Sequence, residues 1–168
     1  SGYDNVISIC PIGTGNSWNH WATYGETIDL SSPGENIRST YGNSSYDYMT
    51  GSSMASPIAA SVFGLLKSYN LNWTNEMVQT MVLATADPII YTVNSENYLD
   101  GMLGKGRVDS YKALSTPLFP KIEYSGEDIM LINDSNGVIN PGDQLELSLI
   151  LFNYPDWGTA INASGFLD

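Results

Sequence analysis

One serine in this sequence stands where a nucleophile for acyl transfer could stand. The stretch "TGSSMASPIAAS", residues 50–61, passes from small polar residues into an apolar run, and Ser53 lies at the transition. If Ser53 begins a helix, its hydroxyl lies beside free backbone N–H groups and the positive end of the helix dipole. Such an environment stabilises a tetrahedral oxyanion. The spacing alone favours a plainer interpretation, in which the serine only caps the helix, and it leaves the nucleophile as the alternative.

The residues around Ser53 are compatible with either interpretation. Gly51 lets the backbone turn tightly and lets a substrate approach, and Ser52 adds a second hydroxyl beside the site. A serine nucleophile also needs a general base, and the only histidine is His20, between two tryptophans in "SWNHWATYG". We interpret His20 as a surface or packing residue rather than as the base. The single cysteine, Cys10, lies in an apolar run and is expected in the core, and no Cys/His cluster supports a zinc site.

Two short apolar strands and a long helix would position this serine. Residues 5–12, "NVISICPI", are typical of a buried strand, and residues 27–34, "TIDLSSPG", of a second strand closed by a Pro-Gly turn. Residues 53–69 predict a helix that is apolar nearly all round and therefore buried. Pro57 is expected in or beside the first turn of that helix, where a missing N–H costs little.

Shorter elements are predicted on either side of the long helix. Residues 36–51 predict a short strand and then a polar turn. After the long helix, Thr74 is expected to cap a second one. Residues 87–106 predict an irregular connection, and "RVDSYKAL" predicts a short helix with Asp109 as its cap.

After Pro120 the pattern changes from helices to strands. The segments 121–134 and 144–154 alternate apolar and polar residues, as half-buried strands do. Four leucines fall on one face of the second segment: Leu145, Leu147, Leu149 and Leu151. The pattern predicts the first strands of an antiparallel β-sandwich, in too small a number to close it.

The stretch between these two segments is rich in turn-forming residues. Asp134, Asn136 and Asp143 offer the oxygen ligands of a calcium loop, but the glutamate that ends an EF-hand loop is absent. We favour a turn here, and a structural calcium site at these three residues is the weaker alternative.

The charge of the chain argues against some classes of partner. The sequence holds 18 acidic and 6 basic residues, for a formal net charge of −12. A surface of this charge repels nucleic acids and anionic membranes, so we expect no nucleic-acid partner. No stretch reaches the roughly 20 apolar residues that a membrane span needs. The acidic, lysine-poor composition is typical of a secreted or cell-surface protein.

Several motifs resemble, in matching order, those of the subtilisin-like serine proteases, or subtilases. The family's nucleophile motif is Gly-Thr-Ser-Met-Ala-x-Pro, and this sequence matches it at Gly51, Ser53, Met54, Ala55 and Pro57. Ser52 replaces the usual threonine and keeps the hydroxyl. "YDNVISIC", "WATYGETIDLSSPGENIRST" and "GKGRVDSYKAL" resemble further segments of the family. The agreement in order and spacing runs across about residues 3–114.

This resemblance implies an α/β fold and a site. Residues 1–116 would form the C-terminal half of a subtilisin-like domain, a parallel sheet with helices on both faces. Residues 117–168 would form a linker and the start of an immunoglobulin-like β-sandwich. Ser53 would be the nucleophile, with its own backbone N–H as an oxyanion-hole donor, and Ser52 would lie beside the oxyanion. Met54 would be an oxidation-sensitive neighbour. No cofactor is required, and calcium is an optional structural ion.

The activity implied by the resemblance is that of a serine endopeptidase acting on polypeptides through an acyl-enzyme on Ser53. The family's Asp-Ser/Thr-Gly and His-Gly-Thr-His motifs, which hold the other two members of the triad, do not occur in this sequence. We therefore expect an upstream half of the same domain as partner, an exposed apolar face without it, and no triad activity in the chain alone. The alternative is a non-catalytic pseudoprotease or an adhesion or binding module, against which the intact Ser53 motif argues.

Overall fold

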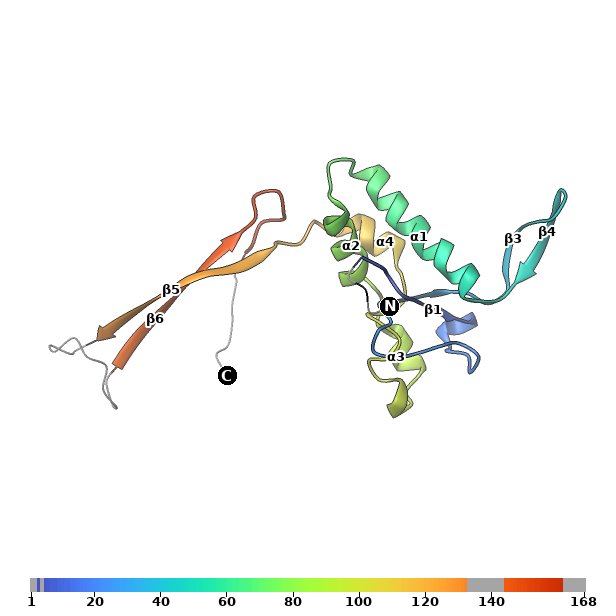
Figure 1. Ribbon diagram of the computed structural model, residues 1–168, viewed down its shortest axis with the longest axis horizontal. Helices are drawn as coiled ribbons and strands as arrows, with labels where there is room; N and C mark the ends of the chain where they lie inside the picture. Colours follow the sequence, from blue (N-terminus) through green and yellow to red (C-terminus); the bar gives the residue numbers. More distant parts are fainter. Residues whose placement is uncertain (1–2, 4, 133–143, 162–168) are drawn as a thin grey trace. The chain divides into compact units, whose positions relative to one another are not determined.

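The computed structural model describes residue 3, residues 5–132 and residues 144–161 (Figure 1). The chain forms two compact units, Ser1–Thr116 (unit 1) and Pro117–Asp168 (unit 2). Unit 1 holds the helices, a parallel strand pair and a separate hairpin, and unit 2 holds one antiparallel pair of strands. None of the helices in the described part of the chain is long and apolar enough to cross a membrane.

Two buried parallel strands form the centre of unit 1. Strand β1, Ile9–Ile12, pairs with β2, Leu30–Pro33, in a register that sets Cys10 beside Ser31. The connection between them contains the short 3-10 helix η1, Thr14–Asn16. Both strands were expected from their short apolar runs, and both are confirmed. Their burial on two sides follows from the helices that cover them, as parallel sheets require.

Helices α1 and α2 cover one face of the pair. Helix α1, Ser52–Tyr69, contacts both strands, and α2, Asn75–Ala84, packs beside α1. The buried residues of α1 recur every three or four positions, as on a helix with one apolar stripe: Ala55, Ala59, Val62 and Leu66. Thr74 caps α2 by accepting a hydrogen bond from the backbone N–H of Met77, which confirms the predicted cap.

The other face of β1 belongs to a hydrophobic cluster of unit 1. Helix α3, Ile89–Val93, and the 3-10 helix η2, Asn97–Leu99, contribute to it. Its buried members are Cys10, Ile12, Ala22, Ile90, Leu99 and Leu103. Helices therefore lie on both faces of a parallel strand pair, and the α/β fold is confirmed. The prediction of an irregular connection over residues 87–106 was wrong where these two helical segments form.

Helix α1 differs from its prediction in two respects. It is buried along one stripe only, and its opposite face, with Ala60 and Leu65, is exposed to solvent in this chain. Pro57 lies in the second turn and not in the first, because α1 begins at Ser52. Its missing N–H removes the hydrogen bond that the carbonyl of Ser53 would accept in a regular helix.

A hairpin precedes α1. Strand β3, Ile37–Tyr41, pairs only with β4, Ser45–Met49, in antiparallel register. Figure 1 shows the hairpin extending away from the rest of unit 1, beyond the end at which α1 begins. The second strand was not predicted, because a polar stretch with glycine and serine indicated only a turn. Gly42 and Ser44 do form the turn, both with positive φ.

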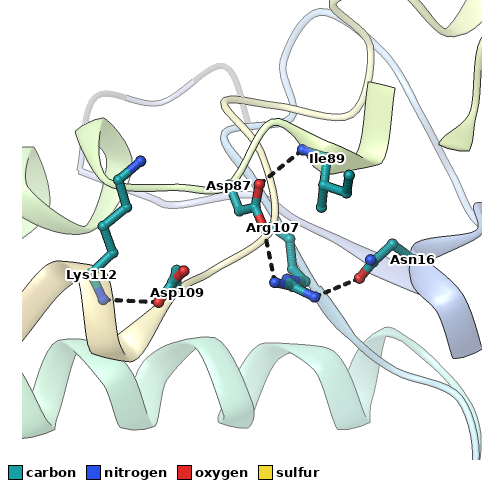
Figure 2. A network of polar contacts seen from close by, with 6 residues as sticks. All are labelled: Asn16, Asp87, Ile89, Arg107, Asp109 and Lys112. Carbon is teal, nitrogen blue, oxygen red and sulfur yellow. Dashed lines mark hydrogen bonds and ion pairs between the residues drawn. The ribbon is translucent and has the colours of Figure 1, made fainter. Parts of the chain in front are cut away.

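A polar network ties the last part of unit 1 to the strands (Figure 2). Arg107 donates to Asp87 Oδ2 at 2.9 Å and to Asn16 Oδ1 at 2.8 Å. The backbones of Arg107 and Asp87 exchange two hydrogen bonds of 2.8 Å, and the N–H of Val108 donates to Ser31 of β2. Helix α4, Ser110–Ser115, follows, with Asp109 Oδ1 accepting from the N–H of Lys112 as its predicted cap.

Unit 2 contains the two strands predicted from alternation. Strand β5, Ile122–Ile132, pairs antiparallel with β6, Gln144–Asn153, with an irregularity between Tyr124 and Gly126. Leu147, Leu149 and Leu151 remain 41–50% exposed, because the described strands form a single two-stranded ribbon. The assignment of unit 2 to an immunoglobulin-like sandwich stays a prediction.

Candidate active site

The backbone of Gly51 sets the entrance to α1. Gly51 has φ 157° and ψ 171°, a conformation that is essentially restricted to glycine. Its N–H donates to the carbonyl of Gly34 at 2.8 Å, and its own carbonyl accepts from Met54 at 3.1 Å and Ala55 at 3.2 Å. This one residue therefore joins the end of the buried sheet to the first turn of the helix.

Gly34 allows the close approach that this arrangement needs. Its N–H donates to the carbonyl of Ile12 at 2.9 Å, which holds it against β1. A Cβ added at Gly34 would lie 2.6 Å from Pro11 Cβ and 3.0 Å from the Gly51 carbonyl oxygen. No ordinary packing tolerates the shorter of these distances. Gly34 was not singled out from the sequence, although the Pro-Gly pair that contains it was taken as a turn.

Ser52 and Ser53 are the first two residues of α1, and both are exposed. Gly51 is the N-cap and no side chain caps the helix, so the interpretation of Ser53 as a capping serine was wrong. Within the part of the chain that the structure describes, the backbone N–H groups of Ser52 and Ser53 have no hydrogen-bond partner. These free donors lie at the positive end of an 18-residue helix, where negative charge is stabilised.

Met54 follows the serine pair and is half-buried. Its sulfur lies near the Gly51 backbone, 3.8 Å from the position of a Cβ built there. The thioether is thus adjacent to the turn that presents Ser53. Among the described residues, the side chain of Ser53 has no hydrogen-bond partner, so this part of the chain holds no base in contact with it.

His20 and Cys10 lie in settings that suit packing. The exposed His20 ring stands edge-on to Trp18, with the ring centroids 5.2 Å apart. Cys10 is a free thiol with no exposed surface, as predicted. Burial raises the pKa of the Cys10 thiol to about 11, with a smaller opposing effect of a hydrogen bond from Ser31. A thiol of this pKa is a poor nucleophile at neutral pH.

No metal centre is found in the described parts of the chain, where no three His, Cys, Asp or Glu side chains gather closely enough to hold an ion. Asp134, Asn136 and Asp143 lie outside the described residues. The turn and the calcium site both remain predictions for these three residues.

An open apolar groove runs along α1 beside β1. The groove has two adjoining parts, and Ile7 and Phe63 line both of them. Near the middle of the helix it also contacts Ile9 and Ala60, and further along it reaches Gly64. In the described structure β1 pairs with β2 along one edge, and on the other edge a single antiparallel bridge joins Ile12 to Trp18. The groove and the part of this edge before Ile12 therefore form a surface of the kind that a further strand and helix could cover.

Fold and site together describe an α/β domain that presents a serine hydroxyl and free N–H groups at the start of a central helix. The model of the subtilase family matches residues 1–106 of this chain. The chain belongs to the subtilase family.

Individual relatives agree with this assignment. Thermitase of Thermoactinomyces vulgaris is 35% identical over 112 residues, which make up 67% of this chain and 37% of thermitase. The halolysin-like extracellular serine protease Nep of Natrialba magadii is 32% identical over 114 residues, which make up 68% of this chain and 20% of Nep. The chain thus spans well under half the length of either relative.

Solved structures share the fold of unit 1. A protease of Pseudoalteromonas arctica superposes with a TM-score of 0.57 at 26% identity, covering 67% of this chain and 36% of that protein. The prenylagaramide maturation protease PagA gives a TM-score of 0.58 at 19% identity, covering 66% of this chain and 42% of PagA. The second likeness concerns the fold alone.

Proposed function

We propose that this chain is the nucleophile-bearing part of a serine endopeptidase and that Ser53 forms the acyl-enzyme. The observation that carries the proposal is the exposure of Ser53 at the start of α1, beside N–H groups that have no hydrogen-bond partner among the described residues. Family membership supports the same reaction, because the subtilase model matches residues 1–106, which include Ser53.

The chemistry would follow the usual order of acyl transfer. Ser53 Oγ attacks the carbonyl carbon of the scissile peptide while its proton passes to a general base. The carbonyl oxygen becomes an oxyanion, and the backbone N–H of Ser53 donates to it. The base then protonates the leaving amine, and water hydrolyses the ester that remains on Ser53. Ser52 lies beside the oxyanion, and no cofactor takes part.

The base and its orienting carboxylate would come from an upstream half of the same domain. The absence of a base in contact with Ser53 among the described residues motivates this part of the proposal. The groove along α1 and the edge of β1 before Ile12 offer a surface for that half to cover. The enzyme would be secreted and would act on polypeptides outside the cell. The relative Nep, an extracellular serine protease, supports this location.

Hydrolysis of casein tests the proposal. The natural protein that contains this chain should release peptides, its Ser53→Ala variant should lose at least about 10³-fold in rate, and Ser52→Ala should retain most activity. Residues 1–168 alone should be inactive. Equal activity of the Ser53→Ala protein would rule out the nucleophile, while rapid hydrolysis by the isolated chain would rule out the upstream base. No hydrolysis by any form would favour the pseudoprotease or binding module.

A further inference from the structure

The β3–β4 hairpin has a face whose chemistry differs from the rest of this acidic chain. Because side chains alternate along each strand and Arg38 pairs opposite Tyr48, the hairpin face comprises Arg38, Thr40, Tyr46 and Tyr48. Tyr46 and Tyr48 are 64% and 63% exposed. The Arg38 guanidinium carbon lies 4.9 Å from the centre of the Tyr46 ring, a cation–π contact.

The positive charge of Arg38 is not neutralised within the described structure. No carboxylate in the described part of the chain lies within ion-pair distance of it. Asp47, the one acid of the hairpin, points to the opposite face, opposite Ser39, and accepts a hydrogen bond from the N–H of Tyr48. A chain with 18 acidic and 6 basic residues thus presents one of its few cations without an ion-pair partner among the described residues.

The hairpin is also held firmly at its base, next to the candidate nucleophile. The N–H of Asn36 donates to Thr50 Oγ1 at 3.0 Å, just outside the two strands. One residue further on, the Gly51 to Gly34 hydrogen bond fastens the hairpin to the sheet. Tyr48 is five residues from Ser53. Five residues span at most about 18 Å when fully extended, so the two residues lie no further apart than that.

We propose that the hairpin face binds the substrate polypeptide within about six residues of the scissile bond and selects a carboxylate side chain there through Arg38. Six extended residues span about 20 Å, which exceeds the bound of about 18 Å between Ser53 and Tyr48, the residue opposite Arg38 in the hairpin. The tyrosine rings offer flat apolar surface to the peptide, and the guanidinium offers paired donors that match a carboxylate. This inference rests on the proposed endopeptidase function and names a preference for that site.

Paired fluorogenic peptides test the preference in the natural protein. Each pair differs by Glu or Gln at one of the six positions on either side of the cleaved bond. We expect at least one position where kcat/KM is about 2–5-fold higher for Glu at low salt, the size typical of an exposed ion pair. The ratio should approach one in about 1 M salt, because screening removes the attraction. Equal rates for Glu and Gln at every position would overturn the proposal.

Substitutions identify the residue responsible. Arg38→Gln should abolish the Glu preference, and Arg38→Glu should convert it to a preference for Lys at the same position. Lys105→Gln makes the same change in net charge at an exposed site away from the hairpin, and it should leave the preference unchanged. Tyr48→Ser should raise KM, whereas Tyr69→Ser, at the far end of α1 and about 27 Å along the helix, should not. An equal effect of Lys105→Gln would contradict a role of Arg38.

Binding of the same peptides to the Ser53→Ala protein separates this inference from the proposed function. Fluorescence anisotropy should give a Kd about 2–5-fold lower for the Glu peptide than for the Gln peptide, without any hydrolysis. If the Glu preference is present in binding but the unsubstituted protein does not hydrolyse casein, only the endopeptidase proposal fails. If hydrolysis proceeds but neither rates nor binding distinguish Glu from Gln, only the hairpin proposal fails.

Discussion

The N–H of Gly51 donates a hydrogen bond to the carbonyl oxygen of Gly34 at 2.8 Å, and this bond connects the buried sheet to the turn that presents Ser53. Both partners need to be glycine, though for different reasons. Gly51 has a backbone conformation that side chains disfavour, and Gly34 has no room for a Cβ beside Pro11. The position of Ser53 thus depends on two residues that take no part in the proposed chemistry.

Substitution of either glycine should reduce the reactivity of Ser53. Gly51→Ala forces a side chain into a strained conformation that costs about 1–3 kcal/mol, and Gly34→Ala pushes the turn away from β1. We expect each variant to react with a fluorophosphonate at least about 10-fold more slowly in the natural protein. Gly126→Ala in unit 2 is the control, since its Cβ would meet only Ile150 at 3.9 Å. Unchanged labelling of both variants would show that the turn tolerates a Cβ.

Gly64 reports whether the groove along α1 is covered. An added Cβ has nothing within 4 Å of it in this chain, so Gly64→Ala should stabilise isolated residues 1–168 by about 0.5–1 kcal/mol. In the natural protein, an upstream half packed into the groove would collide with the added methyl group, and the same substitution should destabilise. Urea unfolding measures both effects. Stabilisation of the same size in both proteins would contradict coverage of the groove.

Met54 should make the activity sensitive to peroxide. Its half-buried sulfur lies beside the turn before Ser53, and oxidation would add a polar oxygen there. We expect hydrogen peroxide to inactivate the natural protein progressively and to spare most activity in Met54→Ala. The exposed Met49 in β4 is the control residue. Peroxide should inactivate the Met49→Ala protein as fast as it inactivates the unsubstituted protein. Equal inactivation of the Met54→Ala protein would assign the sensitivity elsewhere.

Cys10 should make the fold weaker at alkaline pH. Burial raises the pKa of its thiol from 9.0 to about 11, so the thiolate forms first in the unfolded chain. Keeping the Cys10 thiol protonated therefore stabilises the folded chain, and this contribution to the free energy of unfolding is complete below pH 9. It falls by about 2–3 kcal/mol as the pH rises from 9 through 11. Cys10→Ala should show a shallower alkaline decline in melting temperature. Parallel declines in the two proteins would mean that the thiol does not titrate in this way.

The Arg107 network should stabilise unit 1 through specific pairing. Arg107 and Asp87 are about one-third exposed, so the pair is worth about 0.5–1 kcal/mol after screening by solvent. A double-mutant cycle with Arg107→Gln and Asp87→Asn, read by urea unfolding, should give a coupling energy of that size. Strictly additive effects of the two substitutions would indicate that each residue acts separately, for instance Arg107 through Asn16.

The sequence predicted the parts of the fold that rest on local patterns. The apolar runs of β1 and β2, the Thr74 and Asp109 caps and the alternation of β5 and β6 are all found in the structure. The second strand of the hairpin was missed because residues 45–49 follow directly on a polar turn, and the alternation of Tyr46 and Tyr48 with polar residues was taken as part of that turn. Helix α3 was missed because it is only five residues long, too short to show a helical period.

The candidate site could be predicted only in part. The motif around Ser53 indicated a helix start and a turn at Gly51, and the structure has both. The role of Gly34 could not be seen, because its contact with Gly51 joins residues 17 positions apart whose proximity depends on the packing of α1 on β2. The all-round apolar character of α1 predicted burial, yet the face with Ala60 and Leu65 is exposed in this chain. A hydrophobic pattern states which surface should be covered, and not which segment covers it.

The identity of the labelled residue tests the central claim most directly. The natural protein is treated with a fluorophosphonate and digested, and the modified peptide is sequenced by mass spectrometry. We predict one adduct per molecule, on Ser53, with little adduct on Ser52 and none after heat unfolding or in Ser53→Ala. An adduct on another serine, or no adduct in a protein that hydrolyses casein, would contradict the assignment of Ser53 as the nucleophile.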